Sequence, residues 1–330
     1  MARPKILLVG HAATDIGLGH LSRLLTVSKK LKESSDLQLL IFGDQVSRKE
    51  FEDLETLVLP ISKSVSDSVK HFIKESKPRV VIFDLHLGNL PNDLGELLQW
   101  LKKRDIVLIG IDSLLDYCKF LDLLWVPSFY FDEDRQFNYK DKIKFGWDTF
   151  LLKKDLNNPE WKDGKRILIL TGGSDNAQLG KTLPTKIDNK INEGTEIHWV
   201  QGPFSKEPLL PTKPKLKWFI HRDLEQLDEL IVESNYVLTV FGVSFFEVLQ
   251  YGIPTVVFSP YGKKDDIELK ALKNEEVAVI SQDADEAILD LIHLMKDNNK
   301  ARIFSKRAVE KLSIDGSIKL AQEINSFINT

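Results

Sequence analysis

Short apolar runs alternate with amphipathic stretches along almost the whole chain, and this alternation limits its fold more than any other feature. Continuous apolar runs are typical of strands that are buried on both faces, as in parallel sheets covered by helices. The sequence predicts strands at 5–9, 37–42, 56–59, 80–84, 106–111 and 123–126 in the first half, and at 166–170, 196–200, 217–220, 236–240, 255–258 and 277–280 in the second half.

Several of the stretches between these strands show helical periodicity. The first, at 18–31, places several leucines near one face. In the second half, helices are predicted at 224–233, 245–251, 267–272, 284–295, 301–312 and 318–328. Strands and helices that alternate in this way favour doubly wound α/β domains, which bind ligands at the carboxyl ends of their strands.

The alternation weakens between residues 147 and 165, where the turn signals Asn-Asn-Pro and Asp-Gly occur. We interpret this stretch as an interdomain linker, and the length of 330 residues suits two domains. The predicted organisation is an N-terminal domain at 1–150, a second domain at 163–315, and a last helix at 316–330 that crosses back to the first domain.

Composition narrows the class of protein. With 45 basic and 49 acidic residues and a net charge of −4, the chain lacks the basic excess of a nucleic-acid-binding protein. Cys118 is the single cysteine, which excludes an internal disulfide and a multi-thiolate metal site and indicates a reducing, cytoplasmic compartment. No stretch approaches the roughly 20 apolar residues of a membrane span. Peripheral membrane contact and the oligomeric state stay open.

A glycine-containing turn follows the first predicted strand and leads into the first predicted helix. Its Gly17 and Gly19 permit positive φ angles and close approach to the backbone. The helix N-terminus behind them favours an anion, and a neutral imidazole at His20 could act as a base. The alternative is an ordinary turn with a capping histidine. It is not the dinucleotide-binding pattern, because Gly19 is followed by His-Leu-Ser.

A second turn follows the first strand of the second domain. Gly172, Gly173 and Ser174 offer unencumbered backbone amides at the strand end, and Asp175 can cap the helix that follows. The alternative here is an ordinary capped strand-to-helix turn.

The third turn is the most informative. Gly242, Val243 and Ser244 follow the strand at 236–240 and place small residues and amides at a helix N-terminus, where a diphosphate could bind. Glu247, in the first turn of that helix, could accept hydrogen bonds from a ribose diol. Ser-x-x-Glu is also the pattern of a capping box, in which Ser244 caps the helix.

Acidic residues end two further strands. Asp84 ends the strand at 80–84, with His86 two residues later, and Asp112 follows the strand at 106–111. Such residues can point toward a ligand or simply cap turns. Four further histidines have no convincing constellation and are predicted to be surface or packing residues: His71, His198, His221 and His293.

Taken together, the motifs resemble the PseG family of UDP-sugar hydrolases in pseudaminic acid biosynthesis and, more distantly, the MurG glycosyltransferases. The resemblance extends over nearly the whole chain. It is carried by Gly17-Leu18-Gly19-His20 with Arg23, Gly172-Gly173-Ser174-Asp175, Gly242-Val243-Ser244-Phe245-Phe246-Glu247 and, more loosely, by Asp84 with Leu87-Gly88 and by Ile111-Asp112. The chain departs from the family at Phe241, and at Lys263-Lys264, where members usually have a Gln-containing pair.

The resemblance implies the GT-B architecture, in which two Rossmann-like doubly wound domains face a cleft. It implies that His20 is catalytic, and we add Asp84 as a second catalytic candidate. No metal or other cofactor is expected. The predicted substrate-binding residues are Gly17, Gly19, Arg23, Gly172, Gly173, Ser174, Gly242, Val243, Ser244 and Glu247.

The expected partner is a nucleotide sugar, a UDP-sugar first of all. The leading hypothesis is hydrolysis of that sugar by water, with His20 as the base, in surface-polysaccharide or nonulosonic-acid sugar biosynthesis. The alternatives are a glycosyltransferase that moves the sugar to an acceptor hydroxyl, and a non-catalytic nucleotide-sugar-binding protein. Asp84, His86 and Asp15 are the next candidates for the base.

Overall fold

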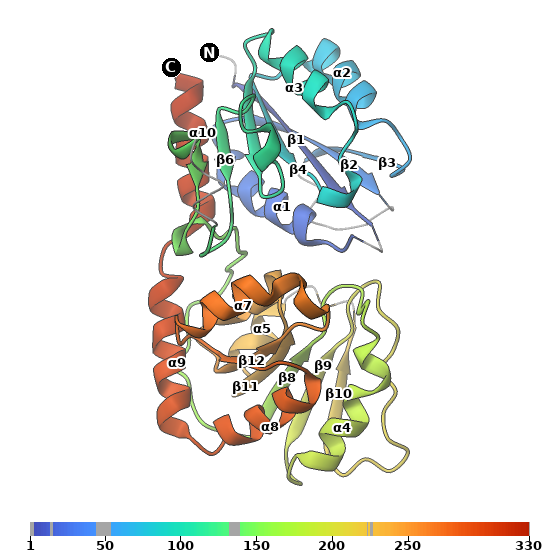
Figure 1. The fold of residues 1–330 in the computed structure, drawn as a ribbon, viewed down its shortest axis with the longest axis vertical. Helices are drawn as coiled ribbons and strands as arrows, with labels where there is room; N and C mark the ends of the chain where they lie inside the picture. The colour runs from blue at the N-terminus through green and yellow to red at the C-terminus, as the bar shows by residue number, and fades with distance from the viewer. Residues whose placement is uncertain are drawn as a thin grey trace. The chain divides into compact units, whose positions relative to one another are not determined.

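The protein is described here by a computed structural model, which covers residues 3–13, 16–43, 54–131, 139–222, 224 and 227–329. The chain divides into two compact units (Figure 1). One comprises Met1–Leu152 together with Ile314–Thr330, and the other comprises Lys153–Ser313. Each unit is a parallel sheet with helices on both faces, as the alternation of apolar and amphipathic segments predicts.

In the described part of the first unit, the sheet has seven strands in the order β3-β2-β1-β4-β5-β6-β7. Each neighbouring pair is parallel. The strands are β1 (Lys5–Ala12), β2 (Asp36–Gly43), β3 (Glu55–Leu59), β4 (Val80–Asp84), β5 (Val107–Ile111), β6 (Leu123–Trp125) and β7 (Ile143–Lys144). The two-residue strand β7 was not predicted, because it is too short to produce a periodic pattern.

Alternate side chains of these strands enter two cores. On β1, Leu7 packs on the side of α2 (Val65–Ser76) and α3 (Leu94–Lys102). Leu8 packs on the opposite side, with α1 (Gly19–Leu31) and α10 (Gly316–Asn329). Because both faces are covered, the strands read as continuous apolar runs rather than as alternating ones. Figure 1 shows α10 beside the first unit, although it is the last element of the chain.

The second unit repeats this plan with six strands in its described part, in the order β10-β9-β8-β11-β12-β13. Its strands are β8 (Arg166–Leu170), β9 (Glu196–Val200), β10 (Lys217–His221), β11 (Tyr236–Val240), β12 (Thr255–Phe258) and β13 (Val279–Ile280). Its helices are α4 (Leu183–Lys190), α5 (Leu227–Val232), α6 (Val243–Leu249), α7 (Asp266–Lys273), α8 (Ala284–Leu294) and α9 (Asn298–Lys311). The core on one face joins α4, α8 and α9, and the core on the other face includes α5 and α6.

Short 3-10 helices connect several of these elements. They are η2 (Leu87–Asn89), η3 (Leu115–Tyr117), η5 (Lys140–Lys142), η6 (Trp147–Thr149), η7 (Leu179–Lys181) and η8 (Gly262–Asp265). None of the described helices combines the length and the apolar character needed to cross a bilayer.

Much of the stretch interpreted as a linker is part of the second unit, which begins at Lys153. Trp161 is buried in the core with α4, and its indole N–H donates to the carbonyl of Asn235 at 2.7 Å. The turn signals around it lie in a segment without helix or strand, which the buried side chain of Trp161 anchors. The predicted helix at 224–233 is observed as Leu227–Val232, and residues 223, 225 and 226 lie outside the described residues.

Candidate active site

The strand order of the first unit reverses between β1 and β4, and the carboxyl end of such a switch point is where open α/β sheets bind ligands. The turn after β1 lies there. The N–H of Gly17 donates to the carbonyl of Ala13 at 2.7 Å, and Gly17 has a φ of 85°, which glycine adopts at no steric cost. Helix α1 then begins at Gly19, which puts His20 in its first turn. Asp15 lies outside the described residues.

Asp84 ends β4 and is fully buried at this switch point. Arg23 donates from Nε to Oδ2 at 2.8 Å and from Nη2 to Oδ1 at 2.7 Å. The ring nitrogen Nδ1 of His20 lies 2.6 Å from Oδ1. The structure therefore brings together three residues that the sequence places 61 and 64 positions apart.

The charges in this group stabilise one another. Burial alone would raise the pKa of Asp84, but Arg23 and then His20 outweigh burial and hold that pKa below its ordinary value. Burial would likewise lower the pKa of Arg23, yet Asp84 and Asp112 hold it above its ordinary value. Asp84 is thus an anion at neutral pH, and Arg23 is a cation.

An ionised Asp84 determines the tautomer of His20. Only a protonated Nδ1 can donate to a carboxylate, so neutral His20 carries its hydrogen on Nδ1 and its lone pair on Nε2. A carboxylate that orients a histidine in this way also stabilises the imidazolium that forms when Nε2 takes a proton. Among the described residues, no hydrogen-bond partner of Nε2 is found. The pair is therefore built like a general base and its orienting carboxylate.

Asp112 is the second carboxylate near Arg23. Its Oδ2 lies 3.2 Å from Nη2 of Arg23, and its side chain is 43% exposed. Asp112 follows β5 with a φ of 66°, an uncommon conformation for a residue with a Cβ. Its position beyond a strand end was noted from the sequence, but its link to Arg23 was not.

His11 and His86 complete this group of polar residues. The backbone N–H of His86 donates to Nδ1 of His11 at 3.0 Å. Burial, together with the nearby His20 and His86, lowers the pKa of His11 to about 4, which keeps Nδ1 available as an acceptor at neutral pH. His11 could not be singled out from the sequence, because its role depends on β1 and β4 being neighbours.

In the second unit, the strand order reverses between β8 and β11, and two of the predicted turns lie at the carboxyl ends of these strands. After β8, Gly172 has a φ of 85°, and the carboxylate of Asp175 accepts from the N–H groups of Leu179 at 2.9 Å and Gly180 at 2.8 Å. A Cβ on Gly202 would lie 2.4 Å from the carbonyl oxygens of Gly172 and Gly173. Gly202, which was not predicted, therefore lets the chain pass close to this turn.

The turn after β11 leads directly into α6. Gly242 is the N-cap, with φ 154° and ψ −168°, a conformation that is essentially restricted to glycine. The alternative interpretation, a capping box, is not observed: the N-cap is Gly242, and Ser244 lies inside the helix. Glu247 was expected in the first turn, but the helix begins at Val243 and its first turn contains no acidic residue. The capping explanation for these residues is thereby removed.

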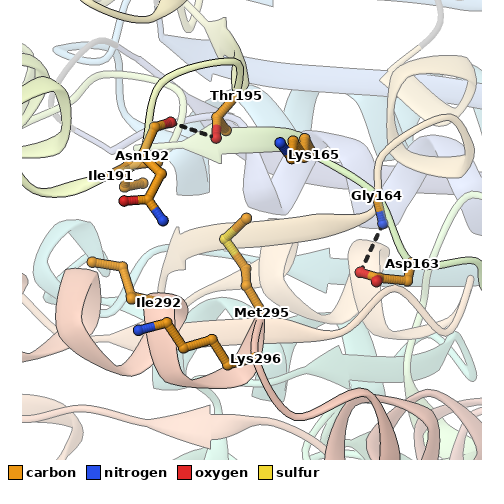
Figure 2. Close-up of a pocket in the computed structure, with 9 residues that line it drawn as sticks. All are labelled: Asp163, Gly164, Lys165, Ile191, Asn192, Thr195, Ile292, Met295 and Lys296. Carbon is orange, nitrogen blue, oxygen red and sulfur yellow. Dashed lines mark hydrogen bonds between the residues drawn. The ribbon is translucent and has the colours of Figure 1, made fainter.

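A pocket with a volume of about 300 Å³ opens elsewhere on the second unit. Figure 2 shows its lining, with a hydrogen bond from the hydroxyl of Thr195 to the carbonyl of Asn192. Lys165 precedes β8 and Thr195 precedes β9, so the pocket lies at the amino ends of these strands. The glycine turns lie at the opposite ends, which are the ends that bind ligands in such sheets.

His198 and His221 form a pair within the second unit, although the sequence placed neither in a constellation. Nδ1 of His198 lies 3.0 Å from Nε2 of His221, and the rings stack with centroids 5.1 Å apart. Burial, then Arg166 and His221, lower the pKa of His198 to about 4. Burial also lowers the pKa of His221. His71 and His293 are exposed. Among the described residues, no group of three or more His, Cys, Asp or Glu side chains could hold a metal ion.

No family model matches the chain. An uncharacterized protein of Methanocaldococcus jannaschii is 28% identical over 271 residues, which are 77% of this chain and 55% of that protein. The chain thus spans about half the length of this relative.

Several solved structures have the same fold. The glycotransferase of kitacinnamycin superposes with a TM-score of 0.68 over 99% of this chain and 100% of its own, at 10% identity. UDP-GlcNAc 2-epimerase of Neisseria meningitidis, bound to UDP-GlcNAc, superposes with a TM-score of 0.64 over 99% of this chain and 100% of its own, at 12% identity. MurG of Acinetobacter baumannii superposes with a TM-score of 0.63 over 98% of this chain and 100% of its own, at 15% identity. The two parallel α/β units of this chain therefore make up the GT-B fold that the sequence predicts.

Proposed function

We propose that the protein is a PseG-like hydrolase that releases the sugar of a UDP-sugar by attack of water. The observation that carries the proposal is the group of His20, Asp84 and Arg23 at the switch point of the first unit. Burying a carboxylate costs desolvation free energy, even when the carboxylate is ion-paired on one side and hydrogen-bonded to an imidazole on the other. Groups whose pKa values are strongly perturbed in this way concentrate at functional sites.

In this mechanism the second unit binds the nucleoside diphosphate. The backbone amides near Gly173, Ser174, Val243 and Ser244 would bind the phosphates, and Glu247 would accept from the ribose hydroxyls. Two observations support this part. Among the described residues, no atom lies within 4 Å of a Cβ built on Gly173 or Gly242, so both turns leave room for a ligand. They also follow adjacent strands at the switch point.

The first unit supplies the base. Nε2 of His20 takes a proton from water as the oxygen attacks the anomeric carbon, and the bond from that carbon to the phosphate oxygen breaks. The electron pair leaves with the nucleoside diphosphate. Asp84 stabilises the imidazolium that forms, and a positioned base of this kind contributes about 10²–10⁴-fold in rate. Gly17 and Gly19 are proposed to allow the substrate to approach the backbone, and Arg23 to hold Asp84 in place.

Glycosyl transfer is the second candidate, because solved structures of the same fold include MurG and the glycotransferase of kitacinnamycin. The same histidine would then deprotonate an acceptor hydroxyl instead of water. The two reactions differ in one respect that is easily measured, which is the need for an acceptor.

The deciding experiment is a turnover assay with a panel of nucleotide sugars and no acceptor, in which the released nucleoside diphosphate is measured. Release of UDP and free sugar supports hydrolysis. UDP release only after an acceptor is added supports transfer. If nucleotides bind but none of the sugars turns over under either condition, the protein is a non-catalytic nucleotide-sugar-binding protein and the proposal is wrong.

A further inference from the structure

The ring of His86 lies beside the ring of His20. The two centroids are 5.8 Å apart, and the rings meet edge to face at 82°. His86 follows Asp84 by two residues, in the loop between β4 and η2, and it is partly exposed. Besides buried His11, the imidazoles of His20 and His86 therefore lie at the switch point of the first unit, and the mechanism above uses only His20.

The surroundings of His86 determine which of its nitrogens is a donor. Its Nδ1 lies 2.7 Å from Oδ1 of Asn89, which can only accept, so Nδ1 carries the hydrogen and neutral His86 keeps its lone pair on Nε2. The hydrogen bond from its backbone N–H to buried His11 anchors the start of this loop. Both His20 and His86 in their neutral forms thus have an accepting Nε2.

The charged groups nearby are one cation and two carboxylates. Arg23 from α1 is paired with Asp84 from β4 and with Asp112 after β5. His11 and His20 are the other titratable groups that interact with this loop, and each would repel a charge on His86 when protonated. Two adjacent imidazolium ions would repel each other.

We propose that His86 is a second catalytic residue: Nε2 of His20 and Nε2 of His86 each accept one hydrogen of the attacking water. One water can donate hydrogen bonds of about 2.9 Å to two ring nitrogens. With both hydrogens held, the oxygen lone pairs point away from the histidines, toward the anomeric carbon. The proton moves to His20, the new carbon–oxygen bond forms, and the nucleoside diphosphate leaves with the electron pair. The hydrogen on His86 stays with the sugar hydroxyl.

This inference rests on the proposed hydrolysis, and its test is the pH dependence of that reaction in His86→Gln. Glutamine cannot titrate, so we expect kcat to fall about 10- to 100-fold, less than the roughly 10²–10⁴-fold contribution of a base that takes the proton. The KM of the nucleotide sugar should change less than threefold. On the acid side, log kcat against pH should approach a slope of 2 in the wild type, because either protonation blocks the water site. In the variant the slope should approach 1.

His71→Gln is the matched control, because His71 is a histidine of α2 whose side chain is 73% exposed. His71→Gln should keep the wild-type kcat and the slope of 2 in log kcat against pH on the acid side. Asn89→Ala is a second variant, which removes the acceptor of the Nδ1 hydrogen without touching the ring. It should lower kcat about 3- to 10-fold, since a single hydrogen bond is worth about 0.5–1.5 kcal/mol.

Each outcome decides between the two proposals. If the wild type hydrolyses a nucleotide sugar and His86→Gln keeps its rate and its slope of 2, the role of His86 is wrong and the hydrolase function stands. If turnover requires an added acceptor, the two-histidine water site is wrong while nucleotide-sugar chemistry stands. If no nucleotide sugar turns over, both proposals fall. A rate lost in His86→Gln but also in His71→Gln would overturn the specific role as well.

Discussion

Arg23 bonds both oxygens of the Asp84 carboxylate, through Nε to Oδ2 and through Nη2 to Oδ1. The planar guanidinium matches the two oxygens, so a single side chain holds the carboxylate in position and stabilises its ionised form. Oδ1 also bonds His20, so this geometry sets the orientation of the proposed base.

We predict that Arg23→Ala destabilises the first unit by about 3–5 kcal/mol, because removal of one partner leaves a buried charge uncompensated. Arg23→Lys should lie between this variant and the wild type, since an ammonium cannot bond both oxygens in the same way. Urea unfolding, followed by a probe in the first unit, measures the effect. Lys217→Ala, which removes an exposed pair with Glu196, is the control and should leave the midpoint unchanged. An equally stable Arg23→Ala protein would contradict the buried pair.

His20→Asn is expected to lose turnover and to retain nucleotide binding. The nucleotide-binding turns belong to the second unit, whereas His20 acts only on the attacking group, so the loss should fall on kcat by about 10²–10⁴-fold. Steady-state kinetics and a titration with UDP separate the two effects. If the affinity for UDP falls as far as kcat does, His20 is a ligand contact and not a base.

UDP or a UDP-sugar should raise the melting temperature of the protein. Binding to the folded state alone contributes about 2.7 kcal/mol at a hundredfold excess over the Kd. Gly173→Ala refines this test, because no described atom lies within 4 Å of the added Cβ. The free variant should melt like the wild type and show a reduced shift with UDP. A full shift in Gly173→Ala would remove this turn from the phosphate site.

Glu247→Ala should weaken nucleotide binding by about tenfold or more, because a hydrogen bond to a charged group is worth roughly 1.5–3 kcal/mol. Ser244→Ala should have a smaller effect, since the backbone amide of residue 244 survives the substitution. Isothermal titration with UDP measures both affinities, and melting temperatures identify any loss of folded protein. Equal affinity for wild type and Glu247→Ala would refute the contact with the ribose.

Stability should fall as the pH drops from 6.5 to 4. His11 and His198 have folded-state pKa values of about 4 against an ordinary 6.5, so in this window the unfolded chain binds more protons than the folded one. Each pKa unit corresponds to about 1.4 kcal/mol, which makes the loss on the order of 3 kcal/mol for each histidine. Asp84, whose pKa is lowered, adds a further loss only as the pH falls below its ordinary value of 3.8.

Urea unfolding at several pH values in His198→Gln tests this dependence. Glutamine does not titrate, so the slope of stability against pH between 6.5 and 4 should be shallower than in the wild type. His293→Gln, at an exposed position on α8, is the control and should keep the wild-type slope. An unchanged slope in His198→Gln would show that the buried histidine pair is not the source.

The fold was largely predictable because buried parallel strands leave long apolar runs. β8 and β9 have the predicted bounds, and only the two-residue β7 lacked a signal. The start of α6 was predicted wrongly for a different reason. Ser-x-x-Glu is a local pattern, whereas the observed N-cap is Gly242, whose backbone conformation the pattern does not encode.

The candidate site was predictable residue by residue but not as a group. His20 stood out because it follows two glycines at the start of a helix, and Asp84 because it ends a strand. Their hydrogen bond, however, depends on β1 and β4 being paired, which is a property of strand order. The roles of His11 and of Gly202 are also non-local, since each is defined by a segment distant in sequence.

The position of α10 bears on how the protein folds during synthesis. The second unit is one continuous stretch, Lys153–Ser313, whereas the first unit needs Ile314–Thr330, which are synthesised after the whole second unit. Until then, the face of the sheet that packs on Leu320 and Ile324 has no partner from α10. Domains usually fold in the order in which they are made. In this chain the second unit is synthesised completely before the last segment of the first unit, so it can fold completely before the first.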